Sequence, residues 1–307
     1  MSLFELASGL AGRYVDHDRL LAWRERYFRA RTKLYPLMRA LYGTFDAAAL
    51  RAHLEERVGT DFEILMVHSS VNHMKPMYTD SPLTLVQMLL DFCGPDRTLA
   101  MPAFYFGDPR IGGTYETFKR QPRVDLRRTP SQMGLVTELF RRTKGVLYSR
   151  HPAYRIAAFG RLAEPLTQGH ERAGTPSGRG TPFDFMATHN TRIIGIGKPF
   201  EVMTQIHHAE AVMGDDFPVP SHHGEGLSMT LVDGEEEIPF LLSGRTFDWR
   251  LNMWKLRGIM GPDSLREWSF HHVPMFATRA GDVTTALIDA AKRGVTLYEK
   301  PFGGKAR

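Results

Sequence analysis

The chain has 307 residues, 42% of them hydrophobic and 24% charged, enough for one large globular domain or two smaller ones. It has no apolar run near the ~18 residues that a membrane span needs, and no basic start before an apolar stretch, so we expect neither a membrane anchor nor a signal peptide. The single cysteine, Cys93, excludes an internal disulfide and indicates a cytoplasmic protein, while the net charge of +5 favours an anionic partner over a polycationic one.

The first 60 residues are predicted to form helices ahead of the main domain. Apolar residues recur at helical spacing over residues 2–15, 17–42 and 46–58, and Asp46 can cap the third of these helices. The second of these helices carries a basic run among aromatic side chains, made of Arg24, Arg26, Arg29, Arg31 and Lys33. The run could bind an anion or nucleic acid, but a solvated face of a packing helix is the preferred explanation, since no nucleic-acid-binding signature accompanies it. We therefore expect a helical extension over 1–60, a main domain over 61–307, and no nucleic-acid partner.

A buried strand is predicted from residue 63, and it ends in three polar residues, His68, Ser69 and Ser70. Ligands bind at the carboxyl ends of strands in open α/β sheets. The following helix is predicted over 83–92, with Pro82 at the favoured first position. Hydroxyls and free N–H groups in such a loop can bind an anion, although the P-loop pattern is absent.

The next segments supply further candidates for binding. A second strand is predicted over 98–102, and residues 103–122 are predicted to form a surface loop in which Asp108 either contacts substrate or is simply solvated. Thr129 is expected to cap a helix that runs to about residue 142, with Arg127 and Arg128 strengthening an anion site near its N-terminus. His151 precedes a proline, where a lone histidine is more often structural.

The second half is predicted to hold a strand over 193–197, a hairpin over 227–242 and two more helices. The hairpin turns at Asp233-Gly234. One helix is expected to start near Phe247-Asp248-Trp249 and continue towards residue 258, and the other to cover 282–292. Residues 170–179 are rich in Gly, Pro and Ser and are predicted to form a mobile loop.

The central motif is Thr204-x-x-His207-x-x-Glu210, which follows the glycine-ended strand at 193–197. This spacing places a hydroxyl, an imidazole and a carboxylate on one helical face, with Thr204 near the N-terminus as a capping residue. Such a trio can perform acid–base chemistry, although a polar face on a surface helix also occurs by chance. A metal site is not expected, because adjacent His207 and His208 splay apart and no cysteine cluster exists.

Six short motifs occur in one order along the chain: Val67-His68-Ser69-Ser70, Thr98-Leu-Ala-Met-Pro102, Thr129-Pro-Ser-Gln-Met-Gly134, Arg150-His151-Pro152, Thr181-Pro182-Phe183 and Thr204-x-x-His207-x-x-Glu210. That order resembles the aminoglycoside N(3)-acetyltransferase family over roughly residues 60–300. The resemblance implies an α/β fold with a central mixed sheet flanked by helices. It also implies a role in antibiotic resistance, through transfer of an acetyl group from acetyl-CoA to an amine of an aminoglycoside or related amino sugar.

The resemblance also implies roles for particular residues. His207 would be the general base. By the chemistry of such a site, Thr204 or backbone N–H groups would stabilise the oxyanion, and Glu210 or, less favoured, Asp248 would orient the imidazole. The residues expected at the cofactor are His68, Ser69, Ser70, Ser131 and Arg128. Those expected at the substrate are Asp108, His151 and Asp248, with His151 lining the thioester channel or only supporting its loop.

Some positions depart from the family pattern. Many members carry a glycine pair in the loop after His-Ser-Ser, where this chain has none, and many carry serine where this chain has Arg155. With the positive net charge and the leading helices, these departures leave two alternatives open. One is an N-acyltransferase for another amine, such as an amino sugar, a sugar nucleotide or a natural-product precursor. The other is a non-catalytic CoA-binding relative. A homodimer is also possible.

Overall fold

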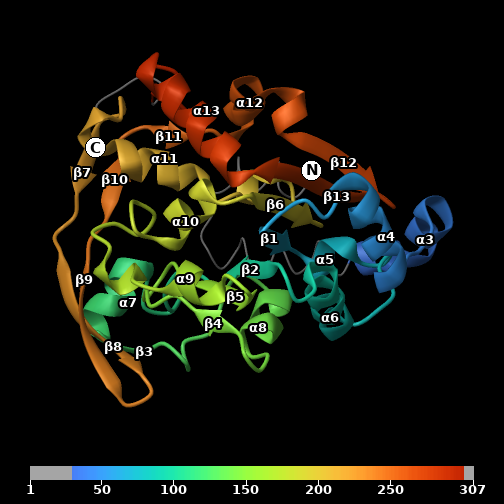
Figure 1. The fold of residues 1–307 in the computed structure, drawn as a ribbon, viewed down its shortest axis with the longest axis horizontal. Coiled ribbons are helices and arrows are strands. Elements are labelled where there is room, and N and C mark those ends of the chain that lie inside the picture. Colours follow the sequence, from blue (N-terminus) through green and yellow to red (C-terminus); the bar gives the residue numbers. More distant parts are fainter. Residues whose placement is uncertain (1–29, 301–307) are drawn as a thin grey trace.

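A seven-stranded mixed sheet lies at the centre of the computed structural model, which describes residues 30–300 (Figure 1). The strand order is β12-β13-β6-β1-β2-β5-β4. β1 pairs in parallel with β2 and β6, and the outer pairs are antiparallel. The strands are β1 (Ile64–Ser69), β2 (Thr98–Pro102), β4 (Leu147–Tyr148), β5 (Ile156–Gly160), β6 (Thr191–Ile196), β12 (Arg266–Phe270) and β13 (Val273–Arg279). The predicted α/β class with a mixed sheet is confirmed.

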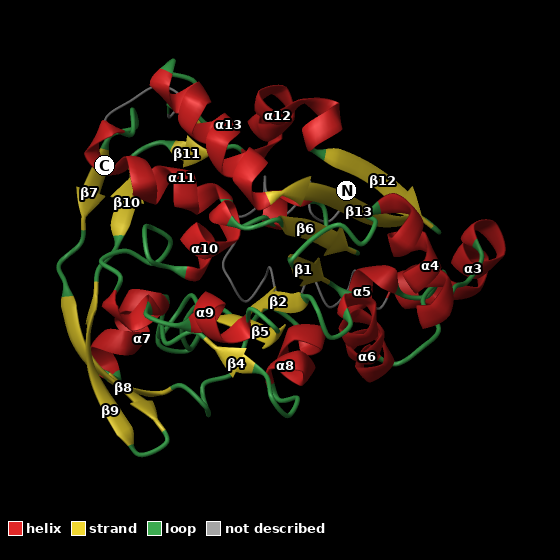
Figure 2. Cartoon of the chain, viewed as in Figure 1, coloured by secondary structure: helices red, strands yellow, loops and turns green. Residues whose placement is uncertain are grey.

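The central strands are apolar on both faces because helices cover both sides of the sheet (Figure 2). All six residues of β1 are buried. Side chains alternate across a strand, so Leu65 and Val67 join one hydrophobic cluster while Ile64 and Met66 join the other. The first cluster takes residues from α4 (Ala47–Arg57), α5 (Val71–Met74), α6 (Pro82–Cys93) and α8 (Leu135–Arg141). The second takes residues from α9 (Ala163–Thr167), α10 (Pro182–Thr188), α11 (Ile206–Met213), α12 (Leu256–Ser264) and α13 (Ala280–Lys292).

Smaller sheets and helices complete the described part. The predicted hairpin is confirmed as β8 (Leu227–Asp233) and β9 (Glu236–Leu242), and it turns at Gly234 and pairs with β3 (Arg123–Asp125). Two short pairs join β7 (Ser221–His223) to β10 (Arg245–Phe247) and β11 (Arg250–Leu251) to β14 (Tyr298–Glu299). The remaining helices are α3 (Tyr35–Tyr42), α7 (Thr114–Arg120) and the 3-10 turns η1 (His170–Arg172), η2 (Phe200–Val202), η3 (Gly214–Asp216) and η4 (Met253–Lys255).

The N-terminal extension is described only from residue 30, so the predicted helix over 2–15 and Arg24, Arg26 and Arg29 lie outside the described residues. In α4, the N–H of Ala49 bonds to Asp46, which caps this helix as predicted. α4 buries Leu50 and Leu54 in the same cluster as α6. The domain boundary at residue 60 stays a prediction. Within residues 30–300, no helix is long and apolar enough to cross a membrane.

Three of the predicted elements were wrong. The helix expected near Phe247 is absent, since β10 ends there and Arg250–Leu251 pairs with Tyr298–Glu299, so α12 begins only at Leu256. Thr129 does not cap a helix: its hydroxyl donates to the carbonyl of Asp125, and α8 begins at Leu135. The expected loop over 103–122 contains α7.

Arg155 explains why the chain before α8 is not helical. Its side chain is fully buried, and its guanidinium donates to the carbonyls of Leu126, Thr129 and Pro130. Burial, and then the nearby charge of Arg141, lower the pKa of Arg155 to about 10, so the side chain still carries its proton at neutral pH. One buried cation therefore holds the irregular segment that leads into α8.

We expect R155A to lower the free energy of unfolding by about 3 kcal/mol or more, because buried carbonyls lose their donor and a cavity remains. Urea denaturation measures this change. The control R172A removes an arginine whose side chain is 80% exposed, and it should stay within about 0.5 kcal/mol of the natural chain. Equal stability of both variants would contradict this role for Arg155.

Candidate active site

The loop that follows β6 places α11 at the carboxyl end of the sheet (Figure 1). At Gly195, an added Cβ would lie 2.2 Å from the ring of Phe276 and 2.5 Å from the carbonyl oxygen of Lys198. At Gly197, φ is +69° and an added Cβ would lie 2.7 Å from the carbonyl oxygen of Ser70. Both positions require glycine, which explains the glycine-ended strand before the central motif.

α11 starts later than its motif predicts. Gln205 is the N-cap residue and makes no side-chain cap, and the first helical residue is Ile206. Thr204 does not cap the helix either, and the predicted capping role is wrong, because its hydroxyl accepts no hydrogen bond from the first N–H groups of α11. The Thr204 hydroxyl is buried without a hydrogen-bond partner in the part of the chain that the structure describes.

His207, Glu210 and Tyr298 form a hydrogen-bonded series. Nδ1 of His207 lies 2.8 Å from Oε2 of Glu210, and the Tyr298 hydroxyl donates to Oε1 of Glu210 over 2.9 Å. The Glu210 side chain is 9% exposed, whereas that of His207 is 47% exposed. A carboxylate only accepts hydrogen bonds, so Nδ1 carries the hydrogen and Nε2 of the neutral ring carries the lone pair. This is the geometry of an oriented general base.

The same contacts set the proton affinity of His207. Loss of solvent is the largest influence and lowers its pKa, but the hydrogen bond to Glu210 and the charge of that carboxylate together raise the pKa above 6.5. Burial and the Glu210 charge raise the pKa of Tyr298, so its hydroxyl remains a donor at neutral pH. His207 thus gains basicity while its ring stays half-exposed.

The segment expected to be a mobile loop lies along α11. The Ser177 hydroxyl donates to the carbonyl of His207 over 3.0 Å, and Nδ1 of His208 lies 2.6 Å from the carbonyl oxygen of Ser177. His208 is buried and its Nε2 lies 3.5 Å from Asp184. The two adjacent histidines therefore have separate partners, and within residues 30–300 no group of three or more His, Cys, Asp or Glu is placed to hold a metal ion.

Asp248 has a different partner from the one considered in the sequence. Its Oδ1 lies 2.9 Å from Nε2 of His222. The neighbouring Phe247 ring packs against Tyr298, with centroids 4.8 Å apart. Glu210, and not Asp248, therefore contacts His207, while Asp248 follows β10, whose last residue packs against Tyr298 at the end of the hydrogen-bonded series.

The other two residues expected at the substrate, Asp108 and His151, already have hydrogen-bond partners within the protein. Asp108 makes a two-pronged ion pair with Arg110, whose hydrogen bonds lower the pKa of Asp108 to about 2. His151 is buried, and its Nδ1 accepts the N–H groups of Ala153 and Tyr154. Burial, followed by nearby His170 and Arg155, holds the pKa of His151 well below 6.5. His151 thus supports its own turn in this structure.

The residues expected at the cofactor lie on two separate loops. Ser69 pairs with Ile196 in the sheet register, and the N–H of Ser70 donates to the carbonyl of Ile196, so this loop adjoins the end of β6. His68 is buried and neither ring nitrogen has a hydrogen-bond partner among residues 30–300. Burial, and then the charge of Lys198, lower its pKa to about 4. His68 is therefore neutral at physiological pH.

The second loop precedes α8 and lies beside the loop of Asp108. The N–H of Ser131 donates to Glu138 and its hydroxyl accepts from Met133, while the Arg128 side chain is 91% exposed. Gln132 bonds to the backbone of Phe104, Phe106 and Gly107 and so ties the two loops together. The structure thus places Ser131 beside the loop of Asp108, and it joins His207 to Glu210 by a hydrogen bond.

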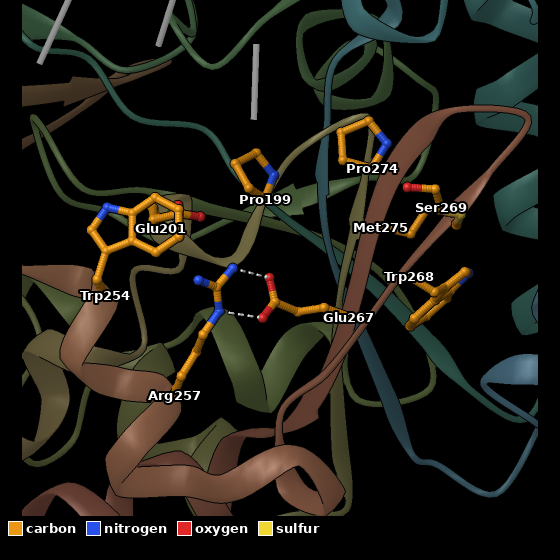
Figure 3. A pocket seen from close by; sticks show the side chains of 9 residues that line it. All are labelled: Pro199, Glu201, Trp254, Arg257, Glu267, Trp268, Ser269, Pro274 and Met275. Atoms are coloured by element: carbon orange, nitrogen blue, oxygen red, sulfur yellow. Dashed lines mark hydrogen bonds and ion pairs between the residues drawn. The ribbon is translucent and has the colours of Figure 1, made fainter. Parts of the chain in front are cut away.

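A separate pocket of about 250 Å³ lies between β12, β13, α12 and the loop after β6 (Figure 3). Arg257 makes a two-pronged ion pair with Glu267 and stacks on the Trp254 ring at 4.4 Å. None of the residues expected at the site lines this pocket, which is formed by Pro199, Glu201, Trp254, Arg257, Glu267, Trp268, Ser269, Pro274 and Met275.

Sequence reasoning missed Tyr298 and Ser177. Tyr298 lies 88 residues from Glu210 in the chain, and no spacing rule connects them. Ser177 lies in a segment whose composition predicted only a loop, and its contact with α11 depends on the tertiary structure.

Comparisons with known proteins agree on one family. A family model described as aminoglycoside 3-N-acetyltransferase matches residues 66–246. Aminoglycoside N(3)-acetyltransferase III from Acinetobacter baumannii is 28% identical over 262 residues, which are 78% of this chain and 87% of that protein. The same-named protein from Serratia marcescens is 25% identical over 257 residues, covering 78% and 92%.

Solved structures agree at the level of the fold. AAC-IIIb in a binary complex with CoASH is 20% identical with a TM-score of 0.66, covering 84% of this chain and all of that one. AAC-VIa bound to sisomicin is also 20% identical, with a TM-score of 0.67 and coverage of 82% and 99%.

We expect E210Q to lower the pKa of His207 below 6.5, because the desolvation that remains disfavours the charged ring. NMR titration of the His207 Cε1 proton measures this pKa in the natural chain, where it should lie above 6.5. The control D248N also changes a carboxylate to an amide, but it should leave the pKa of His207 unchanged because Asp248 contacts His222. The assignment fails if D248N shifts the titration and E210Q does not.

Proposed function

The chain belongs to the aminoglycoside 3-N-acetyltransferase family, and we propose that it transfers an acetyl group from acetyl-CoA to an amine of an aminoglycoside or a related amino sugar. The observation that carries this proposal is the His207–Glu210 hydrogen bond, because it leaves Nε2 of a half-exposed imidazole ready to accept a proton. Both residues lie within the segment that the family model matches.

In the proposed reaction, the amine nitrogen attacks the carbonyl carbon of the thioester. Nε2 of His207 accepts the proton that the nitrogen loses, a C–N bond forms and the C–S bond breaks. The imidazolium then returns the proton to the thiolate, which leaves as free CoA. Glu210 stabilises the transient positive charge, and its own position is held by Tyr298. The thioester is already activated, so no covalent enzyme intermediate is needed.

Stabilisation of the oxyanion is assigned to Thr204. Its buried hydroxyl has no acceptor or donor among the described residues, and such a group favours a new hydrogen-bond partner. The substrate would have to uncover this hydroxyl, because no solvent reaches it in the present conformation. Thr204 is three residues before His207, which places the two groups on neighbouring backbone.

For acetyl-CoA we propose contacts with His68, Ser69 and Ser70 at the end of β1, and with Ser131 and Arg128 before α8. The first loop is supported by its hydrogen bond to the end of β6, from which the chain leads to His207. The second is supported by the exposed Arg128 guanidinium, which suits a phosphate. The buried thiol of Cys93 fits the proposed cytoplasmic location.

One observation favours a second candidate, an N-acyltransferase for another amine. The carboxylates of Asp108 and Asp248, expected to bind ammonium groups of the substrate, are paired with Arg110 and His222. A polycationic aminoglycoside must displace both partners, whereas an acceptor with fewer charges need not. A sugar nucleotide or a natural-product precursor with one amine fits this arrangement.

We also propose a homodimer through α3. Three leucines are exposed by half or more, Leu34 at the N-cap of this helix by 53%, and Leu37 and Leu41 on the helix by 56% and 65%. Exposed apolar stripes mark interaction sites. Light scattering should give twice the chain mass for the natural chain and the monomer mass for L37K. A natural chain that stays monomeric at all concentrations would contradict this proposal.

We expect H207A to reduce kcat by about 10²–10⁴-fold, the usual contribution of a general base, while its affinity for CoA changes little. A free-thiol assay over a panel of aminoglycosides and simpler amines measures turnover, and calorimetry measures CoA binding. The control H223A removes a histidine whose side chain is 73% exposed, and it should keep full activity.

Each outcome of the panel has a separate meaning. Turnover only of acceptors that carry one amine, and of no aminoglycoside, would favour the second candidate, an N-acyltransferase for another amine. CoA binding without turnover of any amine would support a non-catalytic relative, and an H207A variant as active as the natural chain would refute the role of His207.

A further inference from the structure

In the chain after the His-Ser-Ser motif, no backbone N–H of the described residues bonds to the carbonyl of Asn72. The loop continues from Ser70 into the short helix α5 (Val71–Met74). Pro76 has no N–H to bond the carbonyl of Asn72. The N–H of Met77 bonds to the carbonyl of Met74. A donor from elsewhere is therefore needed to satisfy this turn.

Arg31, ahead of α3, supplies that donor. Its Nη1 donates to the carbonyl of Asn72 over 2.7 Å, and its Nη2 donates to those of His73 and Lys75 over 3.1 and 2.7 Å. A planar guanidinium suits this arrangement because its donors have fixed directions. One charged side chain of the N-terminal extension thus holds three carbonyls of the loop.

Other residues of the extension hold the next part of the same loop. Nε of Arg39 donates to the carbonyl of Pro76 over 3.3 Å. The N–H of Phe45 donates to the carbonyl of Met77, and the N–H of Ala47 donates to Asp80. The extension therefore contacts the loop almost continuously between Asn72 and Asp80.

The loop in turn contacts the segment that leads to His207. The N–H of Ser70 bonds to Ile196, and Nδ1 of His73 lies 3.1 Å from the carbonyl oxygen of Gly197. Gly197 is packed so closely against Ser70 that a Cβ would not fit. Arg31 is thus linked, through the loop, to the backbone ahead of α11.

We propose that Arg31 is a positioning residue for acetyl-CoA, which fixes the Ser69–Ser70 loop in the shape that receives the cofactor. This inference rests on the proposed function. Arg31 lies before residue 66, where the family model begins, and the loop it holds lacks the glycine pair that many members carry. In this chain, an arginine from the extension fixes a loop whose sequence differs from theirs.

The test compares R31A and R31K with the control R51A. Arg51 is an exposed arginine of the same extension, and its side chain pairs only with Glu55 on its own helix among the contacts of the described residues. Calorimetry measures the Kd of CoA, steady-state kinetics measures kcat and both KM values, and thermal unfolding measures Tm. These readouts separate positioning of the loop from general stability.

R31A should raise the Kd of CoA and the KM for acetyl-CoA about tenfold, the scale of one lost hydrogen bond to a charged donor, while kcat and the KM for the amine stay within about twofold. R31K should recover part of the affinity, because an ammonium donates hydrogen bonds but lacks the fixed fork. R51A should match the natural chain in every measurement.

Two results would overturn the proposal. One is an unchanged Kd of CoA in R31A. The other is a parallel fall of Tm, kcat and CoA affinity, which would indicate only a structural role. If the natural chain binds CoA but acetylates no amine, the proposed function fails, and the Kd comparison still decides the role of Arg31. If the natural chain does not bind CoA at all, both proposals fail.

Discussion

The hydrogen bond between Nδ1 of His207 and Glu210 is the interaction on which the chemical account depends. It determines which ring nitrogen holds the lone pair, raises the pKa of the imidazole and keeps the ring oriented while half of it faces solvent. Tyr298 extends the series because its hydroxyl binds the second oxygen of the carboxylate. A lone histidine on a helix is common, but one with a buried, hydrogen-bonded carboxylate behind it is equipped for proton transfer.

The sheet gives this histidine its position. The parallel strands β1 and β6 end side by side, so the Ser69–Ser70 loop and the loop towards α11 meet at one edge. Gly195 and Gly197 allow that contact, since a side chain at either position would collide with neighbouring atoms. The N-terminal extension supports the same edge from outside through Arg31. Arg31, which lies outside the family motifs in the sequence, thus contributes to the geometry of the proposed site.

The parts that the sequence predicted well have local causes. The apolar run of β1, the Asp46 cap of α4 and the Asp233-Gly234 hairpin each depend on residues close together in the chain. Two of the incorrect predictions involve partners that are distant in the chain. β14 pairs with Arg250–Leu251, which was expected to be helical, and Arg155 donates a hydrogen bond to the carbonyl of Thr129, which was expected to cap a helix. Glu210 was a candidate from its spacing, but only the fold could show that Asp248 pairs with His222.

The contacts of the charged residues bear differently on the proposed reaction and on the proposed substrate. The His207 role that we propose suits acetylation of any amine, whereas the carboxylates that we propose for an aminoglycoside, Asp108 and Asp248, are paired with Arg110 and His222. The most direct test of the central claim is a crystal structure of the chain with CoA and an amine acceptor bound. The account predicts the acceptor nitrogen within about 3 Å of Nε2 of His207, beside the CoA sulfur, with the Glu210 hydrogen bond intact. An acceptor nitrogen placed away from His207 would contradict it.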